Sequence, residues 1–208
     1  MFFLDNDTLS AGVEILVRRD ADLRRAVERL GPPPLWAREP GFPTLIHIIL
    51  EQQVSLRSAA VAFERLGAHM GRITPDAFLA LSDDTLRQIG FSRQKTRYGR
   101  LLADAVVNGE LDLSALSTLP DPDVSERLTR IKGIGPWTVN IYLLMALRRP
   151  DVWPIGDLAL ASAVRRIKGL DTTPVALTLE RLGEPYRPYR SVAAHILWWY
   201  YLDGKLPE

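Results

Sequence analysis

The stretch Lys132-Gly133-Ile134-Gly135, followed by Pro136, has the residue types of a backbone anion site. The two glycines let the chain turn tightly and let a ligand approach the backbone, because no Cβ intervenes. Pro136 suits the first position of a helix, and the N–H groups at a helix start attract an anion such as a phosphate. Ile134 is expected to point inward and anchor the turn. The plainer interpretation is a helix-turn-helix corner with a glycine cap.

Asp157 is the second candidate, because it ends a loop containing Pro154 and Gly156 and precedes an amphipathic segment. Taken alone, this position predicts a helix N-cap, whose carboxylate accepts backbone N–H groups. The positive end of a helix also favours the ionised form of a carboxylate. Such a group can stabilise positive charge that develops in a reaction, so capping and chemistry are both open to Asp157.

A basic run covers residues 86–100, which contain no acidic residue. Its basic residues are Arg87, Arg93, Lys95, Arg97 and Arg100. The plainer interpretation is a solvated helix face, and the alternative is a surface that meets an anionic partner. The net charge of +1 does not decide between them.

In the segments that position these residues, apolar residues recur at helical spacing, and residues typical of helix ends flank them. Capping residues before proline predict helix starts at Thr74-Pro75, Asp121-Pro122 and Thr173-Pro174. Glycines after apolar-periodic runs predict helix ends at Gly90, Gly109 and Gly183. Sustained period-two alternation is missing, so we expect an all-α fold of roughly ten helices with little or no sheet.

The anion-site candidate lies between two of the expected helices. The first is expected from Pro122 to about Ile131, and the second opens at Pro136. Only Thr138 and Asn140 are polar among residues 136–147, so the second helix should be buried on all sides. Residues 122–147 as a whole resemble the helix-hairpin-helix motif of DNA-binding proteins.

Composition excludes several kinds of chemistry. The 208 residues contain no cysteine, which rules out disulfides, thiolate zinc sites, a Cys nucleophile and a cysteine-ligated iron–sulfur cluster. The three histidines, His47, His69 and His195, are dispersed, so a histidine metal site is not expected. No apolar run approaches the ~20 residues of a membrane span, and the start of the chain does not read as a signal peptide. An intracellular protein without a membrane partner is expected.

Three blocks of the sequence resemble the helix-hairpin-helix (HhH-GPD) DNA glycosylase superfamily, and within it the 3-methyladenine DNA glycosylase II (AlkA-like) branch. These blocks are residues 49–60, residues 131–147 with Asp157, and residues 188–198. The resemblance implies a two-lobed helical fold with the active-site cleft between the lobes. It implies a glycosylase domain over residues 39–208, with residues 1–38 forming N-terminal helices that pack on this body.

The resemblance also implies an activity: a monofunctional DNA glycosylase of base excision repair. Such an enzyme flips out a damaged base, hydrolyses its N-glycosidic bond and leaves an abasic site. Asp157 is the implied catalytic residue. The matched blocks offer no convincing second acid to protonate a neutral leaving purine. An alkylated purine of the 3-methyladenine or 7-methylguanine type already carries positive charge, so one carboxylate suffices and such bases are the expected substrates.

Trp137, Ile141 and Trp198 are implied to line the base pocket, where aromatic faces suit a cationic base. The alternative for both tryptophans is an ordinary place in the core. Lyase-competent relatives carry a Lys at the position of Trp137, to form a Schiff base with the sugar. Trp137 therefore predicts an enzyme that leaves the abasic site uncut.

Gln53 lies where members of the family insert a wedge residue into the DNA. The alternative interpretation is that Gln53 is a polar residue at a helix kink. The implied phosphate-binding residues are Lys132, Gly133, Ile134, Gly135, Ser92, Arg93 and Lys95. Arg190 and Ser191 are candidates for structural caps instead of DNA contacts.

The resemblance implies a monovalent cation, Na⁺ or K⁺, on the backbone carbonyls of Thr129, Ile131 and Ile134, and no required cofactor. The expected partner is double-stranded DNA with a damaged base, bound by a monomer. The expected location is the cytoplasm or nucleoid of a bacterium or archaeon, or the nucleus of a eukaryote. Two rival functions remain: a bifunctional glycosylase/lyase, and a helix-hairpin-helix protein that binds DNA without catalysis.

Overall fold

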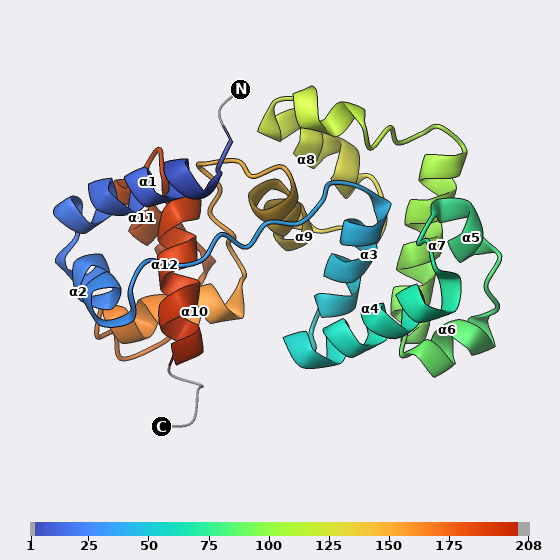
Figure 1. Cartoon of the computed structure of the whole chain (residues 1–208), viewed down its shortest axis with the longest axis horizontal. Helices are drawn as coiled ribbons and strands as arrows, with labels where there is room; N and C mark the ends of the chain where they lie inside the picture. The colour runs from blue at the N-terminus through green and yellow to red at the C-terminus, as the bar shows by residue number, and fades with distance from the viewer. Residues whose placement is uncertain (1–2, 204–208) are drawn as a thin grey trace. The chain divides into compact units, whose positions relative to one another are not determined.

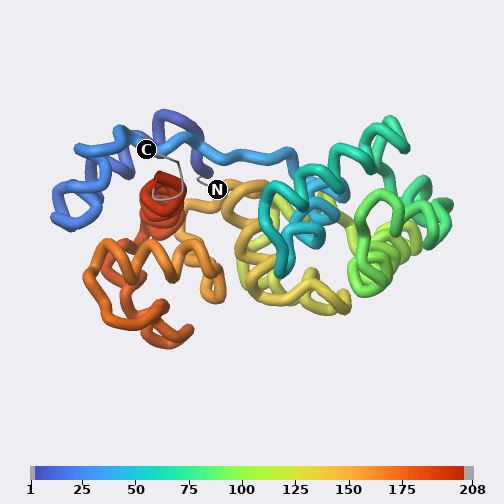
Figure 2. The backbone as a smooth tube through the Cα atoms, turned by 90° about the horizontal axis from the view of Figure 1, so that it is seen from below, coloured from blue at the N-terminus to red at the C-terminus, as the bar shows by residue number. Residues whose placement is uncertain are grey.

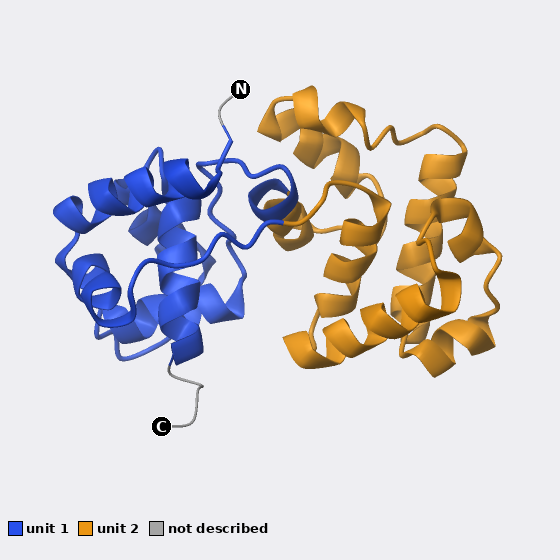
Figure 3. Cartoon of the chain, in the orientation of Figure 1, with its two compact units in different colours: residues 1–37, 143–208 blue, residues 38–142 orange. Residues whose placement is uncertain are grey.

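The computed structural model describes residues 3–203, and over that range it consists of helices and the loops that join them (Figure 1). The expected all-α class is confirmed. The chain divides into unit 1, residues 1–37 with residues 143–208, and unit 2, residues 38–142 (Figure 3). No helix in the described part of the chain is both long enough and apolar enough to cross a membrane.

Unit 1 is built around α12 (Arg190–Asp203), in which every residue from 191 to 198 is buried. A helix buried on all sides must be enclosed by others. The enclosing helices are α1 (Asn6–Arg19), α2 (Ala21–Leu30) and α10 (Leu158–Ile167), which Figures 1 and 2 show around it. The α-helix α11 (Ala176–Gly183) and the 3₁₀ turn η3 (Glu184–Tyr186) complete the unit.

Unit 2 is centred on α3 (Phe42–Glu51), where eight of ten residues are buried. It packs against α4 (Leu56–Met70), α7 (Arg93–Val107) and α9 (Pro136–Ile141). Further elements are α5 (Pro75–Leu79), α6 (Asp83–Ile89), the 3₁₀ turn η1 (Ala115–Thr118) and α8 (Asp121–Thr129). Phe78 lies in this core, with its ring 5.9 Å from that of Phe42 and 5.6 Å from that of Phe91.

The capping predictions have mixed outcomes. The hydroxyl of Thr74 caps α5 as expected, and Gly90 ends α6 at a φ of 122°. The predicted start at Thr173-Pro174 is wrong, because α11 begins at Ala176 without a side-chain cap. Asp121 and Pro122 are themselves the first residues of α8, so that start is displaced by one position.

The start of α12 is tied to the loop that precedes α10. Arg190 Nε donates to Asp151 Oδ1 at 2.9 Å, and the Arg190 backbone N–H donates to the same carboxylate. Ser191 is fully buried, and its hydroxyl donates to the Arg149 carbonyl at 2.6 Å and accepts from Val152 N at 2.9 Å. Arg190 and Ser191 thus form structural hydrogen bonds with this loop, and their assignment as caps instead of DNA contacts stays a prediction.

Gly183 is not the helix cap that its sequence position predicted, because its φ of −82° is one that any residue adopts. The glycine is needed for packing instead. A Cβ there would lie 2.7 Å from the ring of Trp153, which is 4% exposed and donates its indole N–H to the Leu179 carbonyl at 2.8 Å. The indole cannot move aside without losing this hydrogen bond.

Gly183→Ala is therefore expected to lower the free energy of unfolding by about 1–3 kcal/mol, as overpacking of a filled core does. Gly67→Ala is the matched control, because nothing lies within 4 Å of a Cβ built on this glycine inside α4. It should raise stability by about 0.5–1 kcal/mol. Urea titrations of both variants measure the difference, and equal stabilities would contradict the packing argument.

Lys168, at the end of α10, connects that helix to the start of α2. Its ammonium donates to Asp20 Oδ2 at 2.6 Å and to Asp22 Oδ2 at 2.7 Å, and the Tyr186 hydroxyl donates to Asp20 Oδ2 at 2.9 Å. Burial acts to raise the pKa of Asp20, but the hydrogen bonds from Lys168, Leu23 N and Tyr186 outweigh it and hold this pKa below 3.8. The folded state therefore favours ionised Asp20.

A carboxylate with a lowered pKa contributes stability above its unfolded pKa and loses it as pH falls through the folded value. We expect the free energy of unfolding to fall below about pH 4, where Asp20 takes up its proton. Asp20→Asn should make this fall shallower and cost about 1 kcal/mol at pH 7, since the pair is partly exposed. Thermal unfolding from pH 7 to pH 3 tests this, and parallel curves for wild type and variant would contradict it.

Candidate active site and nucleic-acid interface

The predicted helix-hairpin-helix is present, with its residues 122–142 in unit 2 and residues 143–147 in unit 1. Helix α8 ends at Thr129, the turn covers residues 130–135, and α9 begins at Pro136. Ile134 is 3% exposed and its N–H donates to the Ile131 carbonyl at 3.0 Å, so it anchors the turn as expected. After α9 the chain continues as the π-helix η2 (Tyr142–Ala146), which sequence patterning did not predict.

Gly133 holds the inner side of the hairpin against α7. Its φ is 101°, a conformation that favours glycine, and a Cβ there would lie 2.1 Å from Cγ of Tyr98. The Tyr98 hydroxyl in turn accepts a hydrogen bond from Gln94 Nε2 at 2.6 Å. The tyrosine ring therefore occupies the space that any side chain at position 133 would need.

Gln52 holds the hairpin from a second direction. Its Nε2 donates to the Gly133 carbonyl at 2.9 Å and to the Thr138 hydroxyl at 3.0 Å. Sequence reasoning gave Gln52 no role, although an amide at the end of the apolar helix α3 is a signal for a specific hydrogen bond. The opposite side of the hairpin is open, because a Cβ on Gly135 would meet nothing within 4 Å and Lys132 is exposed.

Gln53, the predicted wedge, lies in the turn between α3 and α4. It is exposed and has a φ of 58°, a left-handed conformation that is uncommon for residues other than glycine. Val54 and Leu56 beside it are 45% and 63% exposed, and Ser55 caps α4 by accepting Ser58 N at 3.2 Å. The turn thus presents a polar side chain flanked by exposed apolar ones.

The three predicted phosphate contacts near the start of α7 differ in their surroundings. Ser92 caps α7 by accepting Lys95 N at 3.2 Å, and Arg93 is exposed. Lys95 is half-buried, and its ammonium donates to the Leu50 carbonyl at 2.6 Å. Burial lowers the pKa of Lys95 below its usual value. Ser92 and Arg93 are thus exposed to solvent, whereas Lys95 is held against the end of α3.

In unit 1, Asp157 caps α10 as its position predicted. Its Oδ1 accepts the Leu160 backbone N–H at 2.7 Å and the indole N–H of Trp198 at 3.1 Å. The side chain is half-buried. The structure therefore brings together two of the predicted site residues, Asp157 and Trp198.

An aromatic cluster surrounds Trp198, which is 7% exposed. Trp36 meets it edge-on with ring centroids 6.3 Å apart, and the ring of His195 lies 6.0 Å away. Trp36 and His195 stack on one another at 5.5 Å. Burial lowers the pKa of His195 to about 4, so the ring is neutral near pH 7 and Nδ1 is placed to donate to the Ser191 carbonyl at 2.8 Å.

Trp137 and Ile141, the other predicted pocket residues, lie on α9 in unit 2. Trp137 is half-buried and Ile141 is 3% exposed. The division of the chain thus places the predicted pocket residues in both units. Their common pocket, and the cleft implied for it, stay predictions.

The predicted cation ligands belong to the hairpin. The Ile131 carbonyl accepts the Ile134 N–H, which leaves one of its two lone pairs for another partner. Neutral backbone carbonyls suit a hard cation of low charge. In the described residues, no cluster of three His, Cys, Asp or Glu side chains could hold a metal ion. The donor chemistry of the hairpin therefore fits Na⁺ or K⁺.

The hairpin between two helices and the aspartate-capped helix further along the chain are the arrangement that the resemblance to helix-hairpin-helix DNA glycosylases implied. A family model for "HhH-GPD superfamily base excision DNA repair protein" matches residues 46–188. The chain belongs to this superfamily, and it lies in the 3-methyladenine DNA glycosylase branch. The resemblance seen in the sequence is confirmed.

Two solved structures are similar over most of their length. One is a Schizosaccharomyces pombe 3-methyladenine DNA glycosylase in complex with abasic DNA, with a TM-score of 0.83, 29% identity, and coverage of 90% of this chain and 93% of that chain. The other is a DNA-3-methyladenine glycosidase from Bacillus halodurans, with a TM-score of 0.76, 32% identity, and coverage of 95% and 91%.

Two curated relatives match this chain over only part of their own length. An alkylbase DNA glycosidase-like protein of Schizosaccharomyces pombe is 31% identical over 126 residues, which is 60% of this chain. The chain spans 59% of that relative's length and 58% of the length of a Bacillus subtilis relative.

Proposed function

We propose that this protein is a monofunctional DNA glycosylase that releases alkylated purines from double-stranded DNA and leaves abasic sites. The observation that supports this best is the Asp157 carboxylate, held at the start of α10 by the Leu160 N–H and the Trp198 indole. The 3-methyladenine glycosylases among its structural relatives, one of them bound to abasic DNA, support the same substrate class.

The proposed reaction breaks the bond between the base and C1′ of deoxyribose. The bonding electron pair leaves with the base, so a cationic 3-methyladenine or 7-methylguanine departs as a neutral molecule. Positive charge that builds on the sugar is stabilised by the Asp157 carboxylate. Water then bonds to C1′ and gives up a proton, which the same carboxylate can accept. Asp157 can do this while it caps α10, because a carboxylate has two oxygens and about four acceptor sites.

The base pocket is proposed to use the aromatic faces of Trp198 and Trp137, with Ile141 as an apolar wall. A cation over an aromatic ring gains about 0.5–2 kcal/mol per favourable contact, which selects a cationic base over a neutral one. The Trp198 ring cannot turn freely, because its N–H is bonded to Asp157 and Trp36 lies against it.

The DNA strand is proposed to be held without regard to its sequence. The hairpin Lys132–Gly135 would receive one phosphate on its open side, where a Cβ on Gly135 meets no neighbour. Na⁺ or K⁺ on the Thr129, Ile131 and Ile134 carbonyls would add positive charge beside it. Arg93, with Ser92 and Lys95, would meet neighbouring phosphates, and Gln53 would fill the gap left by the flipped base. A monomer is proposed to act, without another cofactor.

Alkylated DNA provides the direct test. The protein is incubated with DNA methylated by an alkylating agent, and the released bases are identified by mass spectrometry. Methylated purines should appear together with abasic sites in intact strands. Release of no base at all would overturn the proposal and leave a DNA-binding protein without catalysis.

The position of Trp137 gives a separate prediction about strand cleavage. Trp cannot form a Schiff base with the sugar, and no lysine lies on α9. Borohydride added during turnover should therefore trap no covalent protein–DNA species on a denaturing gel. A trapped species would favour the bifunctional glycosylase/lyase.

A further inference from the structure

We propose that an open hollow on unit 2, between α4 and the junction of α6 with α7, binds the phosphate backbone of duplex DNA outside the damaged nucleotide. This inference rests on the proposed function, because it adds a second contact with the same DNA. The hollow has a volume of about 390 Å³. None of its lining residues belongs to the hairpin, to the wedge turn or to the Asp157 cluster.

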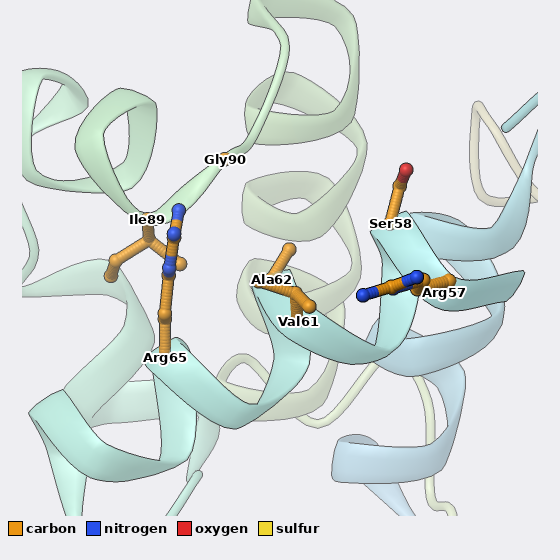
Figure 4. A pocket seen from close by; sticks show the side chains of 7 residues that line it. All are labelled: Arg57, Ser58, Val61, Ala62, Arg65, Ile89 and Gly90. Atoms are coloured by element: carbon orange, nitrogen blue, oxygen red, sulfur yellow. The ribbon is translucent and has the colours of Figure 1, made fainter. Parts of the chain in front are cut away.

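Two arginines enter the hollow from opposite ends (Figure 4). Arg57 and Arg65 both come from α4, and Val61 and Ala62 lie between them. Eight residues of α-helix separate the arginines by roughly 12 Å along the helix axis. Duplex DNA carries about one charge per 1.7 Å of its own axis, so phosphates can meet both guanidinium groups at once.

The positive charge of the hollow is not neutralised within the described structure. Neither Arg57 nor Arg65 forms an ion pair or a hydrogen bond, and both are exposed. Glu64, the one acidic residue of α4, does not line the hollow and is paired with neither arginine. Some exposed arginines of the same unit do have carboxylate partners, such as Arg87 with Asp84 at 2.9 Å. The two unpaired guanidiniums are therefore available to an anionic partner.

The floor of the hollow is kept open by Gly90. This residue ends α6 with a φ of 122°, and a Cβ there would lie 3.2 Å from Cβ of Ala62. Neither α4 nor α7 has an acidic residue in its first turn, whereas α5, α6 and α8 do. The N-terminal ends of α4 and α7 thus add positive potential on this side of unit 2, which the C-terminal end of α6 at Ile89 and Gly90 partly offsets.

The position of the hollow beside the other proposed DNA contacts indicates which anion binds there. Helix α4 begins directly after the turn that carries Gln53, and α7 begins with Arg93, three residues after Gly90 ends α6. The hollow therefore lies along the chain between a proposed wedge and a proposed phosphate contact of the same unit. A DNA backbone, which is polyanionic and continuous, fits this sequence of contacts better than a small anion does.

The test is the salt dependence of binding to a fluorescently labelled duplex that carries an abasic-site analogue. Each phosphate contact contributes about 0.9 to the slope of log K against log salt. The double variant R57Q/R65Q should lower that slope by about 1.8 between about 50 and 200 mM salt, and weaken binding by about tenfold at the lower salt. R57K/R65K, which keeps both charges, should retain the wild-type slope.

R18Q/R25Q is the matched control, because it removes the same charge from two arginines of unit 1 that have carboxylate partners. It should leave the slope unchanged. A second variant, Val61→Glu, places a carboxylate between the arginines and should weaken binding at least as strongly as R57Q/R65Q. Equal thermal stabilities of all variants would confirm that folding is intact, which the exposure of these side chains leads us to expect.

The outcomes separate this inference from the proposed function. Wild-type affinity and slope in both R57Q/R65Q and V61E would overturn the DNA role of the hollow, while base release by the wild-type protein would leave the glycosylase proposal standing. Failure of the wild-type protein to bind any duplex would overturn both.

Discussion

Replacing Asp157 with asparagine is expected to lower the single-turnover rate of base release from alkylated DNA by at least about 10²- to 10³-fold. Asparagine can still accept the hydrogen bonds of Leu160 N and the Trp198 indole, which Asp157 accepts at 2.7 and 3.1 Å. It is also a good N-cap, so α10 should begin as before. The amide carries no negative charge, however, and can neither stabilise a cationic sugar nor take a proton from water.

Binding to duplex DNA should survive in Asp157→Asn, which separates loss of chemistry from loss of the interface. Asp171→Asn is the matched control, because Asp171 is exposed in the loop after α10 and forms no ion pair in the described structure. Its rate should equal that of the wild type. Base release at the wild-type rate by Asp157→Asn would refute the proposed mechanism.

The two hairpin glycines should respond differently to alanine. In Gly133→Ala the methyl group would meet the Tyr98 ring 2.1 Å away at a φ of 101°, so the hairpin must distort. The backbone conformation alone costs about 1–3 kcal/mol, and the melting temperature and DNA affinity should fall together. Gly135→Ala meets nothing within 4 Å and should leave the melting temperature near the wild-type value.

DNA affinity distinguishes the two interpretations of Gly135. If a phosphate approaches the open side of the hairpin, the added methyl group obstructs it and affinity should fall by about tenfold, or 1.4 kcal/mol. Unchanged affinity in a stable Gly135→Ala protein would contradict a phosphate seat there. Replacing Tyr98 with alanine in the Gly133→Ala background should restore part of the lost stability, because the space for a methyl group is then available.

Local sequence signals predicted the parts of the structure that depend on neighbouring residues. The hairpin turn, the buried Ile134 and the Asp157 cap are each specified within a few positions, by glycine conformation, side-chain size and hydrogen bonding to the next turn. The start of α11 was misplaced because a capping motif at Thr173-Pro174 has no counterpart in the structure.

Contacts between distant segments could not be predicted from such local sequence signals. Gln52 bonds to the hairpin 81 residues further along the chain. Trp36 stacks on His195, and the requirement for glycine at position 183 comes from Trp153, a residue 30 positions earlier. Each of these residues looks ordinary in its own segment, and only tertiary packing gives it a role.

The order of segments along the chain has a consequence for biosynthesis. Unit 2 is one uninterrupted stretch, residues 38–142, whereas unit 1 needs helices from both ends of the described sequence. Helices α1 and α2 pack on α12, so on the ribosome they leave the exit tunnel before unit 2 and gain their packing partner only after it. We expect nascent chains stalled before α12 to protect residues 38–142 from protease while α1 and α2 are cleaved.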